Sequence, residues 1–342
     1  MNYIGEDDKM SRNNVNYINY KEECLLDERH RQEYLKLLRA YLRSRKLTNT
    51  TAGATVVAPR LKGVTNNIAA KLTRIMAGNV KIVCEGKENL PDKAAIFAFN
   101  HQGILDNFSW IPYVDRHCII LHSADVNNLL LAAQYNTGLI KVIKGNTENN
   151  RNAKFDVISL LMNGHSVVWF PEGAWNLSPN KFLLPIRYGF LDAARIANVP
   201  VIPSIIEYEY DKNFKNMKRI TIRFGKALYV QDFADLNILL QKYIEIMSTM
   251  QWELMEQRGI VKRSEWNVDK DYKLFLERSY KDLKFGKIDL EKERKNIFQA
   301  DSDFYLFHEI NDYKYDDDGI QRDLSVSTKY YRRADIMLEK TL

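Results

Sequence analysis

Short apolar runs alternate with helical patterns between about residues 80 and 206, and this alternation restricts the possible folds more than any other feature. The runs have the length of buried strands and comprise Val80–Cys84, Ala95–Phe99, Cys118–Leu121, Ile140–Ile143, Val167–Phe170 and Val201–Ile206. Helical patterns fill four of the gaps, at 104–115, 125–136, 152–163 and 187–197. The alternation predicts an α/β fold, with a mixed, largely parallel sheet covered by helices. Strict apolar–polar alternation in Arg219–Phe224 predicts a further, half-exposed strand.

The segments on either side of this unit have a different character. We divide the chain into an N-terminal tail and amphipathic helix (1–60), the α/β domain (61–232) and a helical C-terminal extension of unknown role (233–342). Within the first part, Glu22–Lys46 predicts a long helix with an apolar stripe and several arginines on its other faces. Such a helix can lie on an anionic bilayer, or it can pack on the core and expose a solvated basic face.

Composition narrows the class of partner. The chain has 342 residues with a net charge of +6, which favours anionic partners such as lipid headgroups, coenzyme A or an acidic carrier protein. No nucleic-acid-binding signature accompanies the charge. The three cysteines have no paired spacing, so we expect reduced thiols. No apolar run reaches the roughly 18 residues of a membrane span, and the polar N-terminus is not a secretory signal. We therefore expect a cytoplasmic protein that works peripherally at the inner face of a membrane.

A histidine and an aspartate lie at the junction between the second apolar run and the helical pattern after it. His101 follows the predicted strand that ends at Phe99, and Asp106 falls in the first turn of the predicted helix. Open α/β sheets place their chemistry at such strand ends. An aspartate there can accept the Nδ1 proton of the imidazole and leave Nε2 free to take a proton from a substrate hydroxyl. The alternative is that both residues are structural: the histidine only completes hydrogen bonds at the end of the strand, and the aspartate caps the helix.

A second polar corner follows another predicted strand. Pro171-Glu172-Gly173 comes directly after Val167–Phe170, so it puts one carboxylate and several backbone N–H groups at the same edge of the sheet. Glu172 is a poor candidate for a second base. We expect it to accept hydrogen bonds that either position the acceptor or brace the catalytic loop.

Together these motifs resemble the ordered blocks of the glycerolipid acyltransferase family, which includes 1-acylglycerol-3-phosphate and glycerol-3-phosphate acyltransferases. The matching blocks are Asn100-His101 with Asp106, Gly138–Lys144, Phe170-Pro171-Glu172-Gly173 and Val199–Pro203. Their order and spacing fit, and the matched region covers roughly residues 80 to 230.

The resemblance implies transfer of a fatty acyl chain from acyl-CoA or acyl-carrier protein to a hydroxyl of a glycerolipid or lysophospholipid. His101 would be the general base and Asp106 its orienter, with no metal, no cofactor and no covalent acyl-enzyme. Backbone N–H groups around Gly103 or the Pro-Glu-Gly corner are the candidates for stabilising the oxyanion. Two alternatives remain: the same chemistry on a non-phosphate acceptor such as a specialised metabolite, sugar or amino-lipid, and a non-catalytic lipid-binding protein.

Two departures from the family pattern concern the acceptor. The phosphate-acceptor enzymes typically continue the corner as Thr-Arg-Ser, whereas here Ala174-Trp175-Asn176 follows. The block Gly138–Lys144 ends in a lysine where the family usually has an arginine. Lysine carries a point charge but cannot form the two parallel hydrogen bonds of a guanidinium. We therefore predict an acceptor site formed by Lys144, Glu172, Gly173 and Trp175 in which phosphate recognition is altered, unless Lys144, Lys181 or Arg187 supplies the charge.

Overall fold

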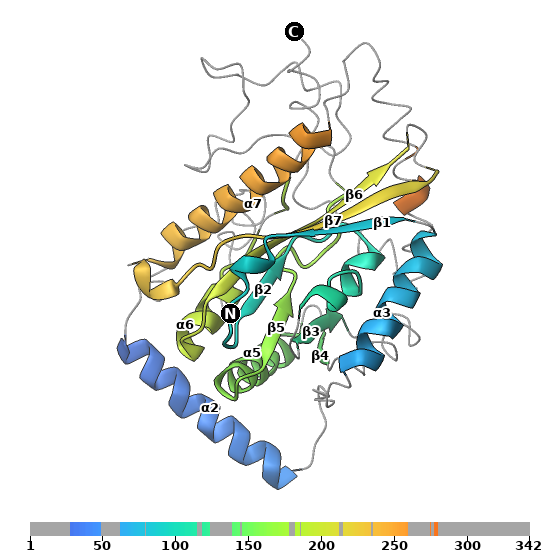
Figure 1. Cartoon of the computed structure of the whole chain (residues 1–342). Coiled ribbons are helices and arrows are strands. Elements are labelled where there is room, and N and C mark those ends of the chain that lie inside the picture. The colour runs from blue at the N-terminus through green and yellow to red at the C-terminus, as the bar shows by residue number, and fades with distance from the viewer. Residues whose placement is uncertain are drawn as a thin grey trace, which may run out of the picture.

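The fold is that of a computed structural model (Figure 1). It describes residues 28–48, 62–78, 80–114, 118–123, 139–143, 146–177, 182–184, 186–211, 215–233, 235–258, 274 and 277–279. The predicted helix at 125–136, residues 1–20 of the tail and most of the C-terminal extension lie outside this part of the chain.

Seven strands form one sheet in the order β1-β7-β6-β2-β5-β3-β4. The strands are β1 (Lys81–Glu85), β2 (Ile96–Phe99), β3 (Cys118–Ser123), β4 (Leu139–Val142), β5 (Ser166–Trp169), β6 (Val201–Tyr210) and β7 (Met217–Phe224). β6 and β7 pair antiparallel, and every other neighbouring pair is parallel. The predicted α/β fold with a mixed, largely parallel sheet is confirmed.

Helices cover both faces of this sheet (Figure 1). They are α2 (Glu28–Thr48), α3 (Lys62–Ala77), α5 (Thr147–Met162), α6 (Gly189–Ala197) and α7 (Leu236–Arg258), with short 3-10 turns η2 (Lys87–Asn89), η3 (Ile104–Asn107), η4 (Ile111–Tyr113) and η5 (Val230–Asp232). Four of the five helices contribute to one buried cluster, while α3 packs with η3 and η4 on the opposite face. α3 is not among the helices predicted from the sequence.

Alternate residues of the central strand β2 face opposite sides of the sheet. Ile96 and Ala98 belong to the cluster that contains α2, α5, α6 and α7, whereas Phe97 and Phe99 belong to the second cluster. All four residues of β2 are buried, which is typical of a strand covered on both faces. The apolar run thus becomes the middle of the sheet, and the residue that follows Phe99 emerges at its carboxyl edge.

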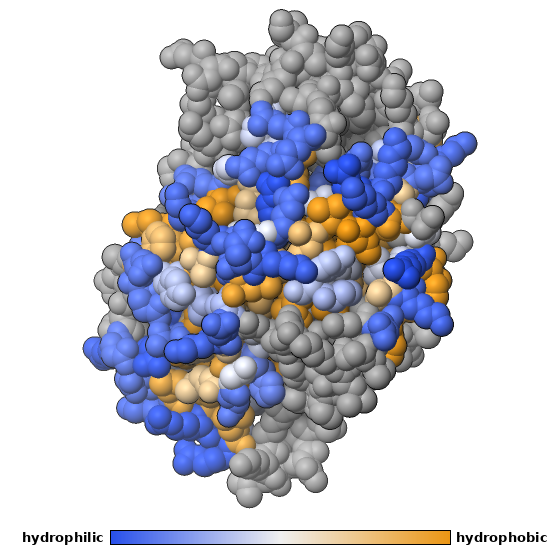
Figure 2. Space-filling view, in the orientation of Figure 1, coloured by the Kyte–Doolittle hydropathy of each residue, from blue (hydrophilic) through white to orange (hydrophobic). Residues whose placement is uncertain are grey.

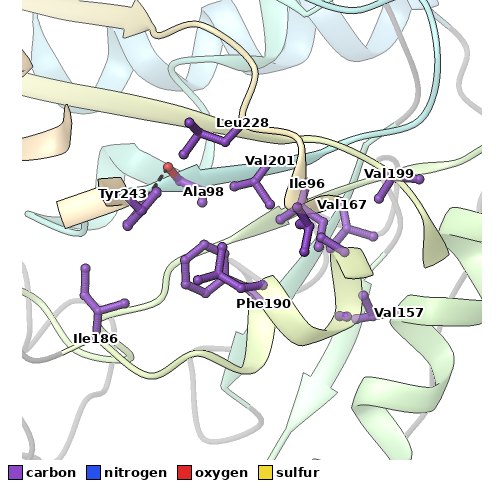
Figure 3. Packing of buried hydrophobic residues seen from close by; sticks show 14 of the residues in the cluster. Ile96, Ala98, Val157, Val167, Ile186, Phe190, Val199, Val201, Leu228 and Tyr243 are labelled. Carbon is purple, nitrogen blue, oxygen red and sulfur yellow. Dashed lines mark hydrogen bonds between the residues drawn. The ribbon is translucent and has the colours of Figure 1, made fainter. Parts of the chain in front are cut away.

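The buried cluster that contains Ile96 and Ala98 joins α6 and α7 to the sheet (Figure 3). Phe190 of α6 packs against Tyr243 of α7 with 4.9 Å between ring centroids. The Tyr243 hydroxyl donates to the Ala98 carbonyl of β2 at 3.1 Å. Burial, with a smaller contribution from the Glu172 carboxylate, raises the pKa of the Tyr243 phenol well above its ordinary value, so the group remains a neutral donor.

The apolar stripe of helix α2 packs against the rest of the fold. Leu35 and Leu38 are buried, and Tyr34 and Tyr41 lie against Phe155 of α5, with ring centroids 5.2 and 5.1 Å apart. The exposed side chains include four basic residues, Arg29, Lys36, Arg39 and Arg43, and two acidic ones, Glu28 and Glu33. The outer edge of this helix is hydrophilic in Figure 2. Of the two alternatives for this helix, the packed arrangement is the one observed.

The predicted helix at 104–115 is wrong. Its residues form two separate 3-10 turns, η3 and η4, joined by Phe108–Trp110. Pro112 has no N–H, and its ring conflicts with the carbonyl of the residue four positions earlier, so an α-helix cannot continue here. The Asn107 side chain donates to the Ile104 carbonyl at 3.2 Å and takes the place of a helical N–H. Asp106 therefore lies in a tight 3-10 turn.

Strand β7 is confirmed but is less exposed than predicted. Its side chains are buried at Ile220, Thr221 and Ile222. Arg223 is covered because its guanidinium donates to Glu85 of β1 at 2.7 Å and to Glu253 of α7 at 2.9 Å.

The three-part division of the chain stays a prediction. Residues of α7 from Leu236 to Met255, which fall in the predicted extension, share the main buried cluster with β2, β5 and β6. This helix is thus an integral part of the α/β core.

Candidate active site

The site lies at the carboxyl end of β2, between its two parallel neighbours β5 and β6. His101 follows β2 after one residue, and Glu172 follows β5 after two. Because parallel strands end at the same edge of a sheet, the two predicted corners meet in space. The backbone N–H of His101 donates to Glu172 Oε1 at 2.8 Å.

Asp106 is fully buried and accepts four hydrogen bonds. Its Oδ2 lies 2.8 Å from His101 Nδ1 and also accepts the backbone N–H groups of Gln102 at 2.5 Å and Gly103 at 2.9 Å. Its Oδ1 accepts the hydroxyl of Tyr208, from β6. A neutral imidazole that donates its Nδ1 proton to this carboxylate would leave Nε2 free to accept a proton.

Two aromatic rings enclose the imidazole. Phe170 stacks on it with 4.3 Å between ring centroids and an interplanar angle of 22°. Trp175 approaches edge-on at 6.1 Å and 75°. The His101 side chain retains 15% of its exposure, so the imidazole is fixed by packing yet remains accessible to a substrate.

Glu172 bonds to the backbone on both sides of the site. Its Oε2 accepts the backbone N–H of Leu184 at 2.6 Å, while Oε1 accepts that of His101. The carbonyl of His101 in turn accepts the backbone N–H of Asn176 at 2.6 Å. Both peptide groups of His101 are therefore bonded to the segment that follows β5.

Most of the backbone N–H groups predicted as oxyanion donors already have acceptors. Those of Gln102 and Gly103 bond to Asp106, that of His101 bonds to Glu172, and that of Gly173 bonds to the Phe170 carbonyl at 3.0 Å. In this arrangement an oxyanion would need donors other than these four. The N–H of Gly103 itself bonds to Asp106, and an oxyanion donor around Gly103 or the Pro-Glu-Gly corner stays a prediction.

The structure brings together His101, Asp106, Glu172 and Trp175 from the predicted set. Gly173 adopts φ 66°, a left-handed turn, and is exposed, whereas Trp175 is buried. Lys144 and Lys181 lie outside the described residues, and Arg187 is exposed. The acceptor roles of Lys144, Gly173 and Trp175 stay predictions.

The sequence analysis did not identify four side chains that hold the segment 100–106, namely Asn100, Gln102, Glu207 and Tyr208. Asn100 forms two hydrogen bonds with the backbone of Ile206, at 2.8 and 3.0 Å. Gln102 donates to Glu207 at 2.8 Å. The available signal was the polar pair Glu207-Tyr208 directly after the apolar run that begins at Val201.

Within the described part of the chain, no cluster of three or more histidine, cysteine, aspartate or glutamate side chains is arranged to bind a metal ion. None of the described helices is both long enough and apolar enough to cross a bilayer.

Comparisons with known proteins concern the segment that contains this geometry, a histidine oriented by an aspartate beside a Pro-Glu-Gly corner. Residues 81–207 match the model of the Acyltransferase family, so this segment is an acyltransferase domain, as its motifs predict. Among solved structures the chain is similar to the 1-acyl-sn-glycerophosphate (LPA) acyltransferase PlsC from Thermotoga maritima. Sequence identity is 20% and the TM-score is 0.47, over 57% of this chain and 79% of that chain. A comparison with curated protein sequences found no match.

Proposed function

We propose that this acyltransferase moves a fatty acyl chain from acyl-CoA or acyl-carrier protein to a hydroxyl of a glycerolipid or lysophospholipid, with His101 as general base. The observation that supports it most is the 2.8 Å contact between His101 Nδ1 and Asp106 Oδ2. An imidazole bonded in this way has its second nitrogen available for a substrate proton.

For this reaction the protein needs only to move one proton and to hold the reacting groups in position. Nε2 of His101 takes the hydroxyl proton while the acceptor oxygen bonds to the thioester carbonyl carbon. Asp106 stabilises the imidazolium that forms. The tetrahedral intermediate then breaks its C–S bond, and the departing thiolate takes the proton back from Nε2. The products are an ester and a free thiol, and His101 returns to its starting state.

A second acceptor class is favoured by Trp175. The corner places a buried indole edge-on against the imidazole, where related phosphate-acceptor enzymes typically carry an arginine. Indole has one N–H and no charge, so it suits a ring or an apolar acceptor better than a phosphate. The same acyl transfer to a non-phosphate hydroxyl is therefore the alternative function.

Association with an anionic membrane surface is part of the proposal. The exposed basic side chains of α2 support electrostatic attachment, since each basic residue near such a surface contributes about 1 kcal/mol. The apolar stripe of α2 is already used in the core. We therefore propose a peripheral attachment to the inner face of the membrane that depends on charge.

The test is acyl transfer by the full chain, followed by mass spectrometry of the products and release of free thiol. Acyl-CoA and acyl-carrier protein are the two donors, and lysophosphatidic acid and monoacylglycerol are the paired acceptors. We expect His101→Ala to reduce turnover by about 10²–10⁴-fold. His165→Ala, which removes a half-buried histidine from the turn before β5, is the matched control and should stay near the native rate. Near-native turnover in His101→Ala would refute the general-base assignment.

The acceptor pair separates the two candidate functions. Preference for lysophosphatidic acid would favour a phosphate-acceptor enzyme, and preference for monoacylglycerol would favour the alternative. Trp175→Arg should move the preference towards the phosphate, because a guanidinium forms charge-assisted bonds that indole cannot form.

A further inference from the structure

Strand β6 extends beyond the end of β2 and runs alongside the catalytic loop. The two strands pair from Ile96 with Val201 to Phe99 with Ser204, after which β2 ends and β6 continues to Tyr210. The residues of β6 just beyond the ladder lie beside the segment 100–106, which contains His101 and Asp106.

Three consecutive residues of β6 bond to three positions of that segment. The Asn100 amide bonds to both the N–H and the carbonyl of Ile206, so it continues the ladder with side-chain atoms. Glu207 accepts the Gln102 amide at 2.8 Å and the Gln251 amide of α7 at 3.2 Å. The next residue, Tyr208, donates its hydroxyl to Asp106 Oδ1.

Successive strand residues point to opposite faces, so Glu207 and Tyr208 reach the loop from opposite sides of the sheet. Tyr208 belongs to the cluster that contains Phe99 and η3, whereas Glu207 bonds to a helix that packs on the other face. The loop is thus bonded from both faces by one strand.

The Tyr208 ring is closely packed as well as hydrogen bonded. It is 7% exposed and Asp106 is 0% exposed, so their contact is shielded from solvent. A Cβ placed on Gly103 would lie 3.1 Å from Tyr208 Cε2, which shows how closely the ring covers the loop backbone.

We propose that Tyr208 is a positioning residue of the acyl-transfer reaction, which acts through Asp106 to keep the carboxylate aligned with His101. The proposal depends on the proposed function in that His101 is taken as the base. Oδ2 is held by His101, Gln102 and Gly103, all on one side of the carboxylate. The Tyr208 hydroxyl is the donor on Oδ1, and it opposes rotation of the carboxylate about its Cβ–Cγ bond.

The Tyr208 hydroxyl also changes the negative charge that the Asp106 carboxylate presents to His101. A donor on Oδ1 withdraws negative charge from Oδ2, so the imidazolium is stabilised less than it would be by a bare carboxylate. The titratable side chains that contact the loop 100–106 in the described structure are Glu172, Glu207 and Tyr208. Of these three side chains, Tyr208 is the one that hydrogen-bonds to the Asp106 carboxylate, and therefore its removal should change the pH dependence of the reaction.

The experiment compares Tyr208→Phe with Tyr210→Phe in the full chain. Tyr210 lies on the same strand and meets Tyr208 edge-on at 6.4 Å, so its variant removes a neighbouring hydroxyl from the same face. We expect Tyr208→Phe to lower kcat by about 10-fold or more, the rate equivalent of a hydrogen bond to a charged group, with little change in KM. The acid limb of its kcat/KM profile should move to higher pH, because Asp106 then carries more negative charge towards His101. Tyr210→Phe should follow the native profile.

A double-variant cycle tests whether Tyr208 acts through Asp106. In an Asp106→Asn background, Tyr208→Phe should have almost no further effect on kcat. Native-like kcat and pH profile in Tyr208→Phe would overturn the proposal, and so would an equal fold-loss in both backgrounds. The proposed function fails separately: it fails if His101→Ala remains active, whatever Tyr208→Phe does.

Discussion

Glu172 is the residue whose two predicted roles are most sharply separated by one substitution. Its carboxylate was expected either to position the acceptor or to brace the catalytic loop, and in the structure it accepts the backbone N–H groups of His101 and Leu184. Glu172→Gln keeps the size and shape of the side chain. It replaces one acceptor oxygen by an amide donor and removes the charge from the other.

The magnitude follows from these two bonds. Whichever way the amide is oriented, one backbone N–H faces another donor in a buried position, which costs about 1–3 kcal/mol. The remaining bond changes from charge-assisted to neutral and loses roughly half its strength. Together we expect a decrease of about 2–4 kcal/mol in the free energy of unfolding. Because the N–H of His101 is one of the two groups, the imidazole should also move, and a shift near 1 Å can cost about 10²-fold in rate.

The assay combines urea unfolding with steady-state kinetics in which donor and acceptor are varied separately. The expected result for Glu172→Gln is a lower unfolding midpoint and a kcat reduced by about 10- to 100-fold, with acceptor KM within about twofold of native. Glu88→Gln is the matched control, because it removes an exposed carboxylate in η2 by the same change. Its midpoint and kcat should stay native.

Either of two results would refute this reasoning. A raised acceptor KM with unchanged kcat and stability would mean that Glu172 contacts the acceptor instead of bracing the loop. Unchanged values of all three quantities would mean that the bonds to His101 and Leu184 contribute nothing measurable.

Three further predictions concern the loop, a thiol and the surface. Gly103→Ala should lower kcat while KM stays near native, because its Cβ would press on the Tyr208 ring at 3.1 Å and displace the hydroxyl from Asp106; a native kcat would contradict this. Burial raises the pKa of the Cys84 thiol from 9.0 to about 11, so peptide mapping should show little iodoacetamide labelling of the folded protein at pH 8 and faster labelling as the pH approaches 11. The raised pKa stabilises the fold below pH 9, and this contribution is lost as the pH rises through about 11. Sedimentation with anionic vesicles should show binding that salt reverses and that Arg39→Glu weakens, and binding unaffected by salt would refute an electrostatic attachment.

The central strands were predictable from the sequence because each is a short run whose residues are buried on both faces. Ala95–Phe99 and Val201–Ile206 are continuous apolar runs, and β2 and the start of β6 lie in the middle of the sheet. The 3-10 turns at 104–113 were missed because apolar residues at helical spacing outweighed Pro112. Periodicity reports which residues are buried, and two short turns can bury the same residues as one helix.

The contact between His101 and Asp106 was predictable, and the groups that hold the two residues in place were not. His101 and Asp106 are five residues apart and meet through local geometry, so their spacing carries the information. Tyr208 reaches Asp106 across 102 positions, and Glu172 reaches His101 across 71. Such contacts depend on which strands become neighbours, and a single sequence does not state the strand order.

The bonds to the segment 100–106 come from strand β6 and from the segment after β5, and under the proposed function this separates acyl transfer from acceptor choice. His101 is held through backbone bonds to Glu172 and Asn176, and Asp106 is held by Tyr208. Trp175 lies within the same segment but contacts the imidazole through its ring alone. Replacing that ring therefore removes none of the hydrogen bonds described above for His101 and Asp106 while it changes the surface beside the imidazole. If the proposed function holds, the sheet can keep one acyl-transfer chemistry while the corner after β5 adapts to a different acceptor, as the predicted replacement of the usual arginine by tryptophan implies.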